Sequence, residues 1–94
     1  MNKTTLTIVA YDISCDKRRT KVHKLLSGFG TWTQFSLFEC FLTEKQWVDL
    51  LYRLQALIVP NEDCIRVYRL CTTCTDRVET FGQARPADDV LFLV

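Results

Sequence analysis

The strongest constraint on this chain is the alternation of strand-like and helix-like segments within 94 residues. Segments 5–13, 32–42 and 64–70 are rich in β-branched and aromatic residues, which is typical of β-strands. Between them, apolar residues recur at helical spacing over 16–27 and over 43–58, and a proline ends the second pattern. The predicted order is strand, helix, one bent strand or two short ones, helix and strand.

This order predicts an α+β fold, the ferredoxin-like βαββαβ sandwich, in which both helices cover one face of the sheet. We expect Ser14 or Asp16 to cap the first helix, and Thr43 and Gln46 to form a capping box at the second. The apolar stripes expected to face the core are Val22, Leu25, Leu26 and Phe29 in the first helix and Trp47, Leu50, Leu51, Leu54 and Ile58 in the second.

The whole chain, 1–94, is predicted to be one ferredoxin-like domain, because 11.0 kDa is enough for one modest core. We divide it into a core over 1–74 and a C-terminal extension over 75–94. The stretch 71–89 is polar and irregular, and the apolar end 90–94 (VLFLV) predicts an extra last strand.

The first strand is apolar on both of its faces. Alternation puts Leu6, Ile8 and Ala10 on one face and Val9, Tyr11 and Ile13 on the other. A sheet with one covered face should instead alternate apolar and polar residues. Two helices cover only one face, so we expect the second face to be buried against another copy of the chain. This predicts a homodimer formed through the sheet face.

Charge is divided unevenly along the chain. The net charge of +1 combines six basic and two acidic side chains in residues 1–24 with six basic and nine acidic ones in the remaining seventy. The near-zero total excludes a histone-like polycation and an acidic disordered tail.

The basic residues of the first segment gather on the first helix. On a helical wheel Lys17, Lys21 and Lys24 share one face, Arg19 flanks it, and Arg18 lies toward the apolar side. Such a face suits a row of phosphates. The alternative is an ordinary solvated helix face.

Asp12 ends the first strand, directly after Tyr11 and before the basic helix. A carboxylate at a sheet edge can bind a hard cation such as Mg²⁺ together with phosphate oxygens and water. One carboxylate per chain is a poor metal site, but two symmetry-related Asp12 side chains could share one ion at a dimer interface. The alternative is an aspartate that caps or solvates the end of a strand.

Five cysteines, an odd number without a secretory context, predict reduced thiols and not a disulfide framework. Cys71 and Cys74 form one C-x-x-C, which supplies too few ligands for a structural zinc. A redox pair should open a helix, whereas this pair follows a strand, so we interpret it as a partly buried thiol pair. His23 is expected to be exposed on the basic helix, with a general-base role as the alternative.

No segment approaches the eighteen apolar residues of a membrane span, and the apolar run 6–10 is too short for a signal peptide. We expect a soluble, cytoplasmic protein with no membrane partner. The sequence contains no P-loop, nucleophile elbow or H-E-x-x-H, which removes most enzyme classes.

Several motifs recur in a fixed order along the chain. They are YDI at 11–13, KRRTKVHKLL at 17–26, GFG at 28–30, QFSLFEC at 34–40, a W-x-x-L-x-x-x-L helix that starts at Trp47, and RVYRLC-x-x-C at 66–74. Together they resemble the Cas2 family, the smaller of the two core CRISPR-associated proteins of spacer acquisition. The resemblance covers roughly residues 5–74, and its specificity lies in the combined order and spacing, because each motif alone is weak.

The resemblance implies a ferredoxin-like fold, homodimers formed through the sheets, and a C-terminal strand that is often added to the partner's sheet. It implies that Asp12 is the ligand of a catalytic Mg²⁺ in cleavage of RNA or DNA. The family positions tied to nucleic-acid contact or activity match Tyr11, Arg19, Lys21 and Phe38, although the Lys21 position is Arg in some relatives. Phosphate contact by Lys17 and Arg18 is our extension from the helix face.

The family has two roles, which the sequence does not separate. Some members resemble nucleases, and in others the dimer bridges two dimers of the larger CRISPR-associated integrase and holds duplex DNA by phosphate contacts. Our leading prediction is the scaffold of the integrase complex, with Mg²⁺-dependent phosphodiester cleavage as an added activity on RNA or DNA. The alternative is a ferredoxin-like regulatory or RNA-binding module without nuclease chemistry.

Overall fold

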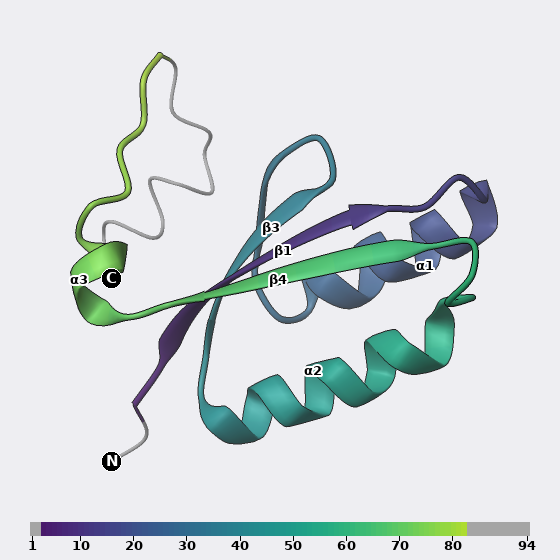
Figure 1. Ribbon diagram of the computed structural model, residues 1–94, viewed down its shortest axis with the longest axis horizontal. Coiled ribbons are helices and arrows are strands. Elements are labelled where there is room, and N and C mark those ends of the chain that lie inside the picture. The colour runs from purple at the N-terminus through teal and green to yellow at the C-terminus, as the bar shows by residue number, and fades with distance from the viewer. Residues whose placement is uncertain (1–2, 83–94) are drawn as a thin grey trace.

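The computed structural model describes residues 3–82, so the strand predicted at 90–94 lies outside the described residues. Four strands form one antiparallel sheet in the order β2-β3-β1-β4 (Figure 1). The strands are β1 (Thr5–Asp12), β2 (Thr31–Gln34), β3 (Leu37–Leu42) and β4 (Cys64–Leu70). The segment predicted as one bent strand or two is therefore two strands, β2 and β3.

Two helices connect the strands. Helix α1 (Asp16–Ser27) joins β1 to β2, and α2 (Glu44–Leu57) joins β3 to β4. With this strand order, the connections confirm the predicted α+β fold class and the ferredoxin-like βαββαβ arrangement.

Strand β1 lies inside the sheet and pairs with β3 on one side and β4 on the other. Ile8 stands opposite Glu39 of β3 and Tyr68 of β4. Because side chains alternate along a strand, this register turns Val9 toward the helices and Ile8 and Ala10 away from them.

The two helices begin differently. Cys15 is the N-cap of α1 and makes no side-chain capping hydrogen bond, so the predicted cap at Ser14 or Asp16 is wrong. Asp16 is the first residue of the helix, where its carboxylate pairs with the Arg19 guanidinium. The capping box of α2 is confirmed: the Gln46 N–H donates to Thr43 Oγ1 at 3.2 Å, and the Thr43 N–H donates to Gln46 Oε1 at 2.8 Å.

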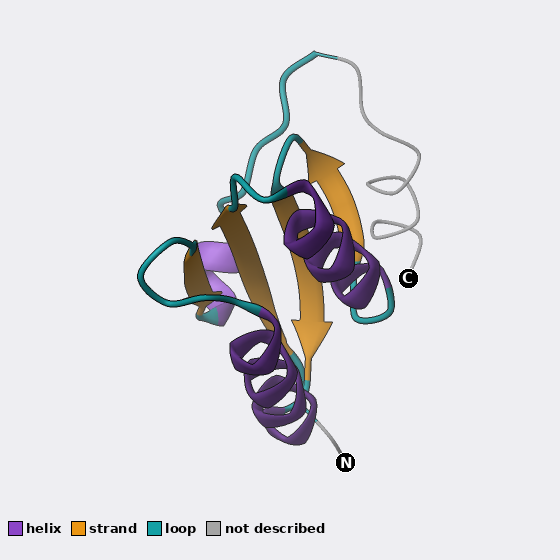
Figure 2. Cartoon of the chain, turned by 90° about the vertical axis from the view of Figure 1, so that its right-hand side faces the viewer, coloured by secondary structure: helices purple, strands orange, loops and turns teal. Residues whose placement is uncertain are grey.

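The core lies between the helices and the face of the sheet that they share (Figure 2). Side chains with no exposed surface come from both helices and from the sheet, and include Val9, Val22, Leu26, Phe38, Cys40 and Leu50. Each buried Leu or Phe contributes about 1.5–3 kcal/mol relative to exposure. Burial also raises the pKa of the Cys40 thiol to about 11, so this cysteine stays protonated at neutral pH.

Gly30 lies where the chain enters β2 and passes very close to β3. A Cβ atom on Gly30 would lie 2.4 Å from Cys40 Sγ and 2.5 Å from the carbonyl oxygen of Glu39. Both distances are far below a van der Waals contact, so glycine is needed for this close approach.

Beyond β4, the chain forms the short helix α3 (Thr72–Thr75) in a stretch that was predicted to be irregular. Cys71 is the N-cap of α3, so the C-x-x-C follows a strand and also opens a helix. Cys71 and Cys74 are both exposed, and the interpretation as partly buried thiols is therefore wrong. Among the described elements α3 packs mainly against β4, which leaves both thiols uncovered.

Candidate nucleic-acid and metal site

Asp12 is the last residue of β1, opposite Cys64 of β4, and its side chain is exposed. Alternation along β1 puts it on the same face as Ile8 and Ala10, away from the helices. Within residues 3–82, no three His, Cys, Asp or Glu side chains come together as metal ligands. Within the described residues Asp12 is therefore not part of a complete ligand set, and it fits Mg²⁺ only when water, phosphate oxygens or a second Asp12 complete the octahedral shell of the ion.

The open face is our name for the sheet face turned away from α1 and α2. Its apolar members are Leu6, Ile8, Ala10, Leu37, Phe41, Tyr68 and Leu70. Phe41 is 42% exposed and Tyr68 is 46% exposed, although both lie in strands that pair with β1. The predicted pattern of two apolar faces is therefore confirmed, whereas the homodimer expected to cover the second face stays a prediction.

The basic face is our name for the surface of α1 formed by Lys17, Lys21 and Lys24. All three side chains are exposed. Among the described residues, none of the three lysines forms an ion pair with an acidic side chain. Three positive charges on one side of α1 are therefore not neutralised by the described part of the chain.

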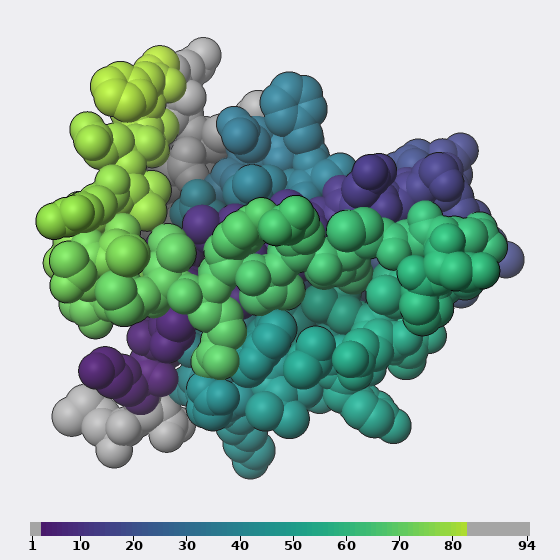
Figure 3. Space-filling model, in the orientation of Figure 1, coloured from purple at the N-terminus to yellow at the C-terminus, as the bar shows by residue number. Residues whose placement is uncertain are grey.

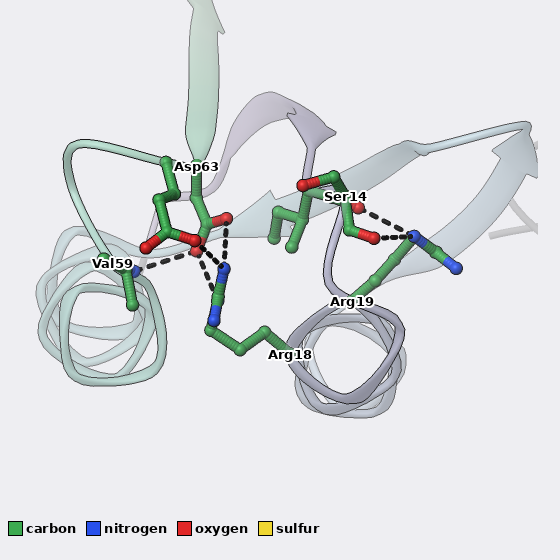
Figure 4. A network of polar contacts seen from close by, with 7 residues as sticks. Ser14, Arg18, Arg19, Val59 and Asp63 are labelled. Atoms are coloured by element: carbon green, nitrogen blue, oxygen red, sulfur yellow. Dashed lines mark hydrogen bonds and ion pairs between the residues drawn. The ribbon is translucent and has the colours of Figure 1, made fainter.

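Arg18 points in another direction, toward the loop between α2 and β4 (Figure 4). Its guanidinium donates to both carboxylate oxygens of Asp63, at 2.8 and 3.1 Å, and to Glu62 at 3.2 Å. Asp63 also accepts a 2.8 Å hydrogen bond from the Val59 N–H, and its side chain has no exposed surface. The hydrogen bonds from Arg18 and Val59 lower the pKa of Asp63, and Asp63 in turn raises the pKa of Arg18. This bidentate pair holds α1 against the loop, which leaves Arg18 less available for phosphate than the lysines.

Arg19 stabilises the connection between β1 and α1 by hydrogen bonds. Its guanidinium donates to the carbonyl oxygens of Ile13 at 2.8 Å and Ser14 at 3.4 Å (Figure 4), and it also pairs with Asp16. The Arg19 side chain is still 41% exposed. Arg19 therefore holds the loop that follows Asp12 and retains an accessible surface.

Tyr11 and Phe38 lie in the core beneath α1. Phe38 has no exposed surface and Tyr11 is 6% exposed. The Tyr11 hydroxyl shares a 3.1 Å hydrogen bond with His23 Nδ1, and the His23 ring stands edge-on to Phe38 with centroids 5.0 Å apart. Burial raises the pKa of Tyr11, opposed by a hydrogen bond with Ser36 and by the charge of Arg19. In this structure, Phe38 supports neighbouring side chains and presents no surface to nucleic acid.

A cavity of about 440 Å³ opens beside this cluster and is lined by Tyr11, Arg19, Thr20, His23, Phe35 and Ser36. The turn between β2 and β3 is formed by Phe35 and Ser36, and neither residue was predicted from the sequence to belong to the site. Phe35 is 88% exposed, and its backbone has a left-handed φ of 43°. The Trp32 indole N–H donates to the Phe35 carbonyl oxygen at 2.6 Å and holds the turn. The motif QFSLFEC contained both residues, but nothing in it indicated this conformation. His23, as expected, is exposed.

The described helices are all shorter or more polar than a membrane-spanning helix.

The chain matches known proteins over most of its length. The family model of the CRISPR associated protein Cas2 matches residues 5–78. A CRISPR-associated endoribonuclease Cas2 of Synechocystis sp. is 40% identical over 85 residues, which cover 86% of this chain and 90% of the relative. A CRISPR-associated endoribonuclease Cas2 of Thermus thermophilus is 41% identical over 75 residues, which cover 80% of each protein.

Solved structures show the same similarity. The crystal structure of Streptococcus pyogenes Cas2 at pH 6.5 has a TM-score of 0.72 and 36% identity, and the match covers 82% of this chain and 99% of that one. A hypothetical protein from Thermus thermophilus, TT1823, has a TM-score of 0.78 and 36% identity, with 87% and 95% covered. The fold, the motif order and these matches agree, and the chain belongs to the Cas2 family of CRISPR-associated proteins.

Proposed function

We propose that this chain acts in CRISPR spacer acquisition as a homodimer that binds duplex DNA and bridges copies of the larger CRISPR-associated integrase. The observation that carries this proposal is the basic face, where Lys17, Lys21 and Lys24 are exposed and unpaired among the described residues of a Cas2-family chain. The basic face and the open face belong to different elements, so nucleic acid and a second copy need not compete for one surface.

The spacing of the basic face suits a DNA backbone. At about 1.5 Å per residue, the three lysines extend along roughly 10 Å of the helix axis. One DNA strand carries a phosphate every 3.4 Å of duplex axis, so the basic face can meet about three phosphates. Such contacts hold a duplex without reading its sequence, as a scaffold for varied DNA requires.

The open face supports the homodimer. Phe41 and Tyr68 expose large apolar surfaces there, and neither α1 nor α2 covers them. Strand β4, drawn green across the front of Figure 3, is an edge of the described sheet and can accept a further strand. A second copy is a suitable occupant, because a two-fold interface places the same apolar patch on both sides.

A second function, Mg²⁺-dependent phosphodiester cleavage, is favoured by the exposed Asp12 and by the relatives that are called endoribonucleases. When bound, Mg²⁺ would polarise a phosphate and supply an activated water. The part of this chain would be to hold the ion with the Asp12 carboxylate and to hold neighbouring phosphates with the basic face. RNA is the substrate that the names of those relatives suggest, and DNA is the alternative.

The test of the cleavage function is Asp12→Asn, which keeps the shape of the side chain but removes its charge. We expect the purified variant to lose Mg²⁺-dependent cleavage of RNA or DNA and to retain its fold by circular dichroism. Cleavage that continues unchanged would show that Asp12 is not the site. Scoring spacer acquisition in the same variant separates the two functions: persistence of acquisition without cleavage supports the scaffold.

The test of the scaffold is the double charge reversal Lys17→Glu and Lys21→Glu, with Lys45→Glu on the exposed side of α2 as the matched control. We expect weaker duplex binding and a smaller salt dependence, by about 0.9 in the slope of log K against log salt for each lost phosphate contact. The control should keep the slope of the unmodified chain. An unaltered slope in the double variant would rule out the basic face as the binding surface.

A further inference from the structure

Cys71 and Cys74 lie directly after β4, in the turn that forms the short helix α3 (Figure 1). The Thr75 N–H donates to the Cys71 carbonyl oxygen at 2.9 Å, and the Thr75 hydroxyl donates to the same oxygen at 3.0 Å. These bonds close one helical turn around the pair, and residues three apart in such a turn share a face. Cys71, the N-cap of α3, and Cys74 therefore lie on one side of this turn.

The pKa values of the two thiols are shifted in opposite directions. Hydrogen bonds from the Cys74 N–H and the Cys74 S–H lower the pKa of Cys71. The same contact raises the pKa of Cys74, which remains the proton donor. A thiolate is the nucleophile in exchange reactions, and a neighbouring protonated thiol can resolve the product. The pair is therefore divided into an attacking and a resolving cysteine.

Both sulfur positions are accessible. Cys71 and Cys74 are exposed, whereas Cys40 is fully buried in the core. Cys71 also lines a cavity of about 540 Å³ together with Lys3, Phe41 and Leu70. In a chain whose open face is not covered by a second copy, this cavity leaves room for a small molecule beside Cys71, and the exposed Lys3 on its rim suits an anionic one.

We propose that Cys71 and Cys74 are a redox-active dithiol that exchanges with small anionic disulfides of the glutathione type. The Cys71 thiolate attacks one sulfur of the disulfide, forms a mixed disulfide and releases one thiolate. Cys74 then attacks the Cys71 sulfur and expels the second thiolate, and the Cys74 proton goes to a released thiolate. In all, the dithiol loses two electrons and two protons, one of them released when the Cys71 thiolate forms. The small disulfide takes up two electrons and two protons and becomes two thiols. This proposal does not rest on the proposed nucleic-acid function.

Zinc binding explains the site less well. Structural zinc takes four ligands, and Cys71 and Cys74 supply two. Among residues 3–82, no third His, Cys, Asp or Glu joins them to form a cluster.

The test equilibrates the full chain with mixtures of reduced and oxidised glutathione, followed by acid quenching, alkylation and mass spectrometry of the peptide that holds the pair. We expect a peptide lighter by two hydrogen atoms, with no glutathione attached, in a fraction that rises with the share of oxidised glutathione. Cys74→Ala should instead accumulate a mixed disulfide with glutathione at Cys71. Its Cys71 should also react severalfold more slowly with iodoacetamide, because the thiolate has lost its S–H donor.

Cys64→Ala is the matched control, because Cys64 is also exposed but lies at the other end of β4. It should leave the oxidation of the pair unchanged. A mixed disulfide that persists in the unmodified chain would overturn the proposal, because Cys74 would then be unable to resolve it. A pair that stays reduced in excess oxidised glutathione, or zinc that copurifies and depends on both cysteines, would also overturn it.

Discussion

The two faces of the sheet carry similar apolar residues but have opposite environments. On the covered face, Phe38 and Cys40 of β3 have no exposed surface and pack beneath the helices. On the open face, Phe41 of the same strand is 42% exposed. The sequence alone does not distinguish these positions, because each belongs to an apolar alternation along one strand.

This difference separates the residues that stabilise the fold of one chain from the residues that can contact a partner. The covered face joins four elements in one core, so its residues are needed by a single chain. The open face adds apolar surface that neither helix uses, and it ends at the exposed Asp12. The features that suit a partner or a metal ion therefore lie on the face that contributes less to the fold.

The largest difference in stability should be found between alanine variants of two phenylalanines in β3. Phe38→Ala removes a fully buried ring and should lower the free energy of unfolding by about 3–5 kcal/mol. Phe41→Ala should lower it by about 1 kcal/mol or less in dilute protein, and should instead weaken self-association. Urea denaturation measures the first quantity and sedimentation the second. Equal losses of stability in the two variants would contradict the division between the faces.

A smaller loss of stability should follow from adding one methyl group at Gly30, on the covered side of the sheet. Gly30→Ala forces a Cβ against Cys40 and the backbone of Glu39, and should destabilise the chain by about 1–3 kcal/mol. Gly28→Ala is the matched control, since its new Cβ would meet only the Leu25 carbonyl oxygen at 3.4 Å. Thermal denaturation of both variants provides the comparison, and a Gly30→Ala variant as stable as the control would show that β2 can move away from β3.

The smallest effect on the free energy of unfolding concerns the Arg18–Asp63 pair, which joins α1 to the loop between α2 and β4. This effect depends on pH. Because the pKa of Asp63 is lowered in the fold, its contribution is present above the ordinary carboxyl pKa of about 4 and is lost as pH falls through the lowered value. Asp63→Asn should therefore be less stable than the unmodified chain at pH 6, and the gap should narrow below pH 4. A gap independent of pH, in denaturation series across this range, would contradict an electrostatic role for Asp63.

Much of the fold could be predicted from the sequence, because strand composition and helical periodicity are local signals. The stripes of α1 and α2 and the Thr43 capping box depend on residues within a few positions of one another. They were confirmed apart from Leu51, which does not belong to the core cluster. The roles of Arg18 and Phe38 could not be predicted in the same way. The Asp63 partner of Arg18 lies 45 positions away, and the burial of Phe38 depends on which sheet face receives the helices.

The turn between β2 and β3 has a consequence for how this chain would respond to selection. Phe35 holds a left-handed backbone, which disfavours residues with a Cβ by about 1–2 kcal/mol, and glycine adopts it freely. Selection for thermal stability alone would thus favour glycine at position 35 and remove an aromatic ring that is 88% exposed. In laboratory evolution toward a more stable variant, we therefore expect an early substitution at Phe35 in this turn, with no change to the residues of the core.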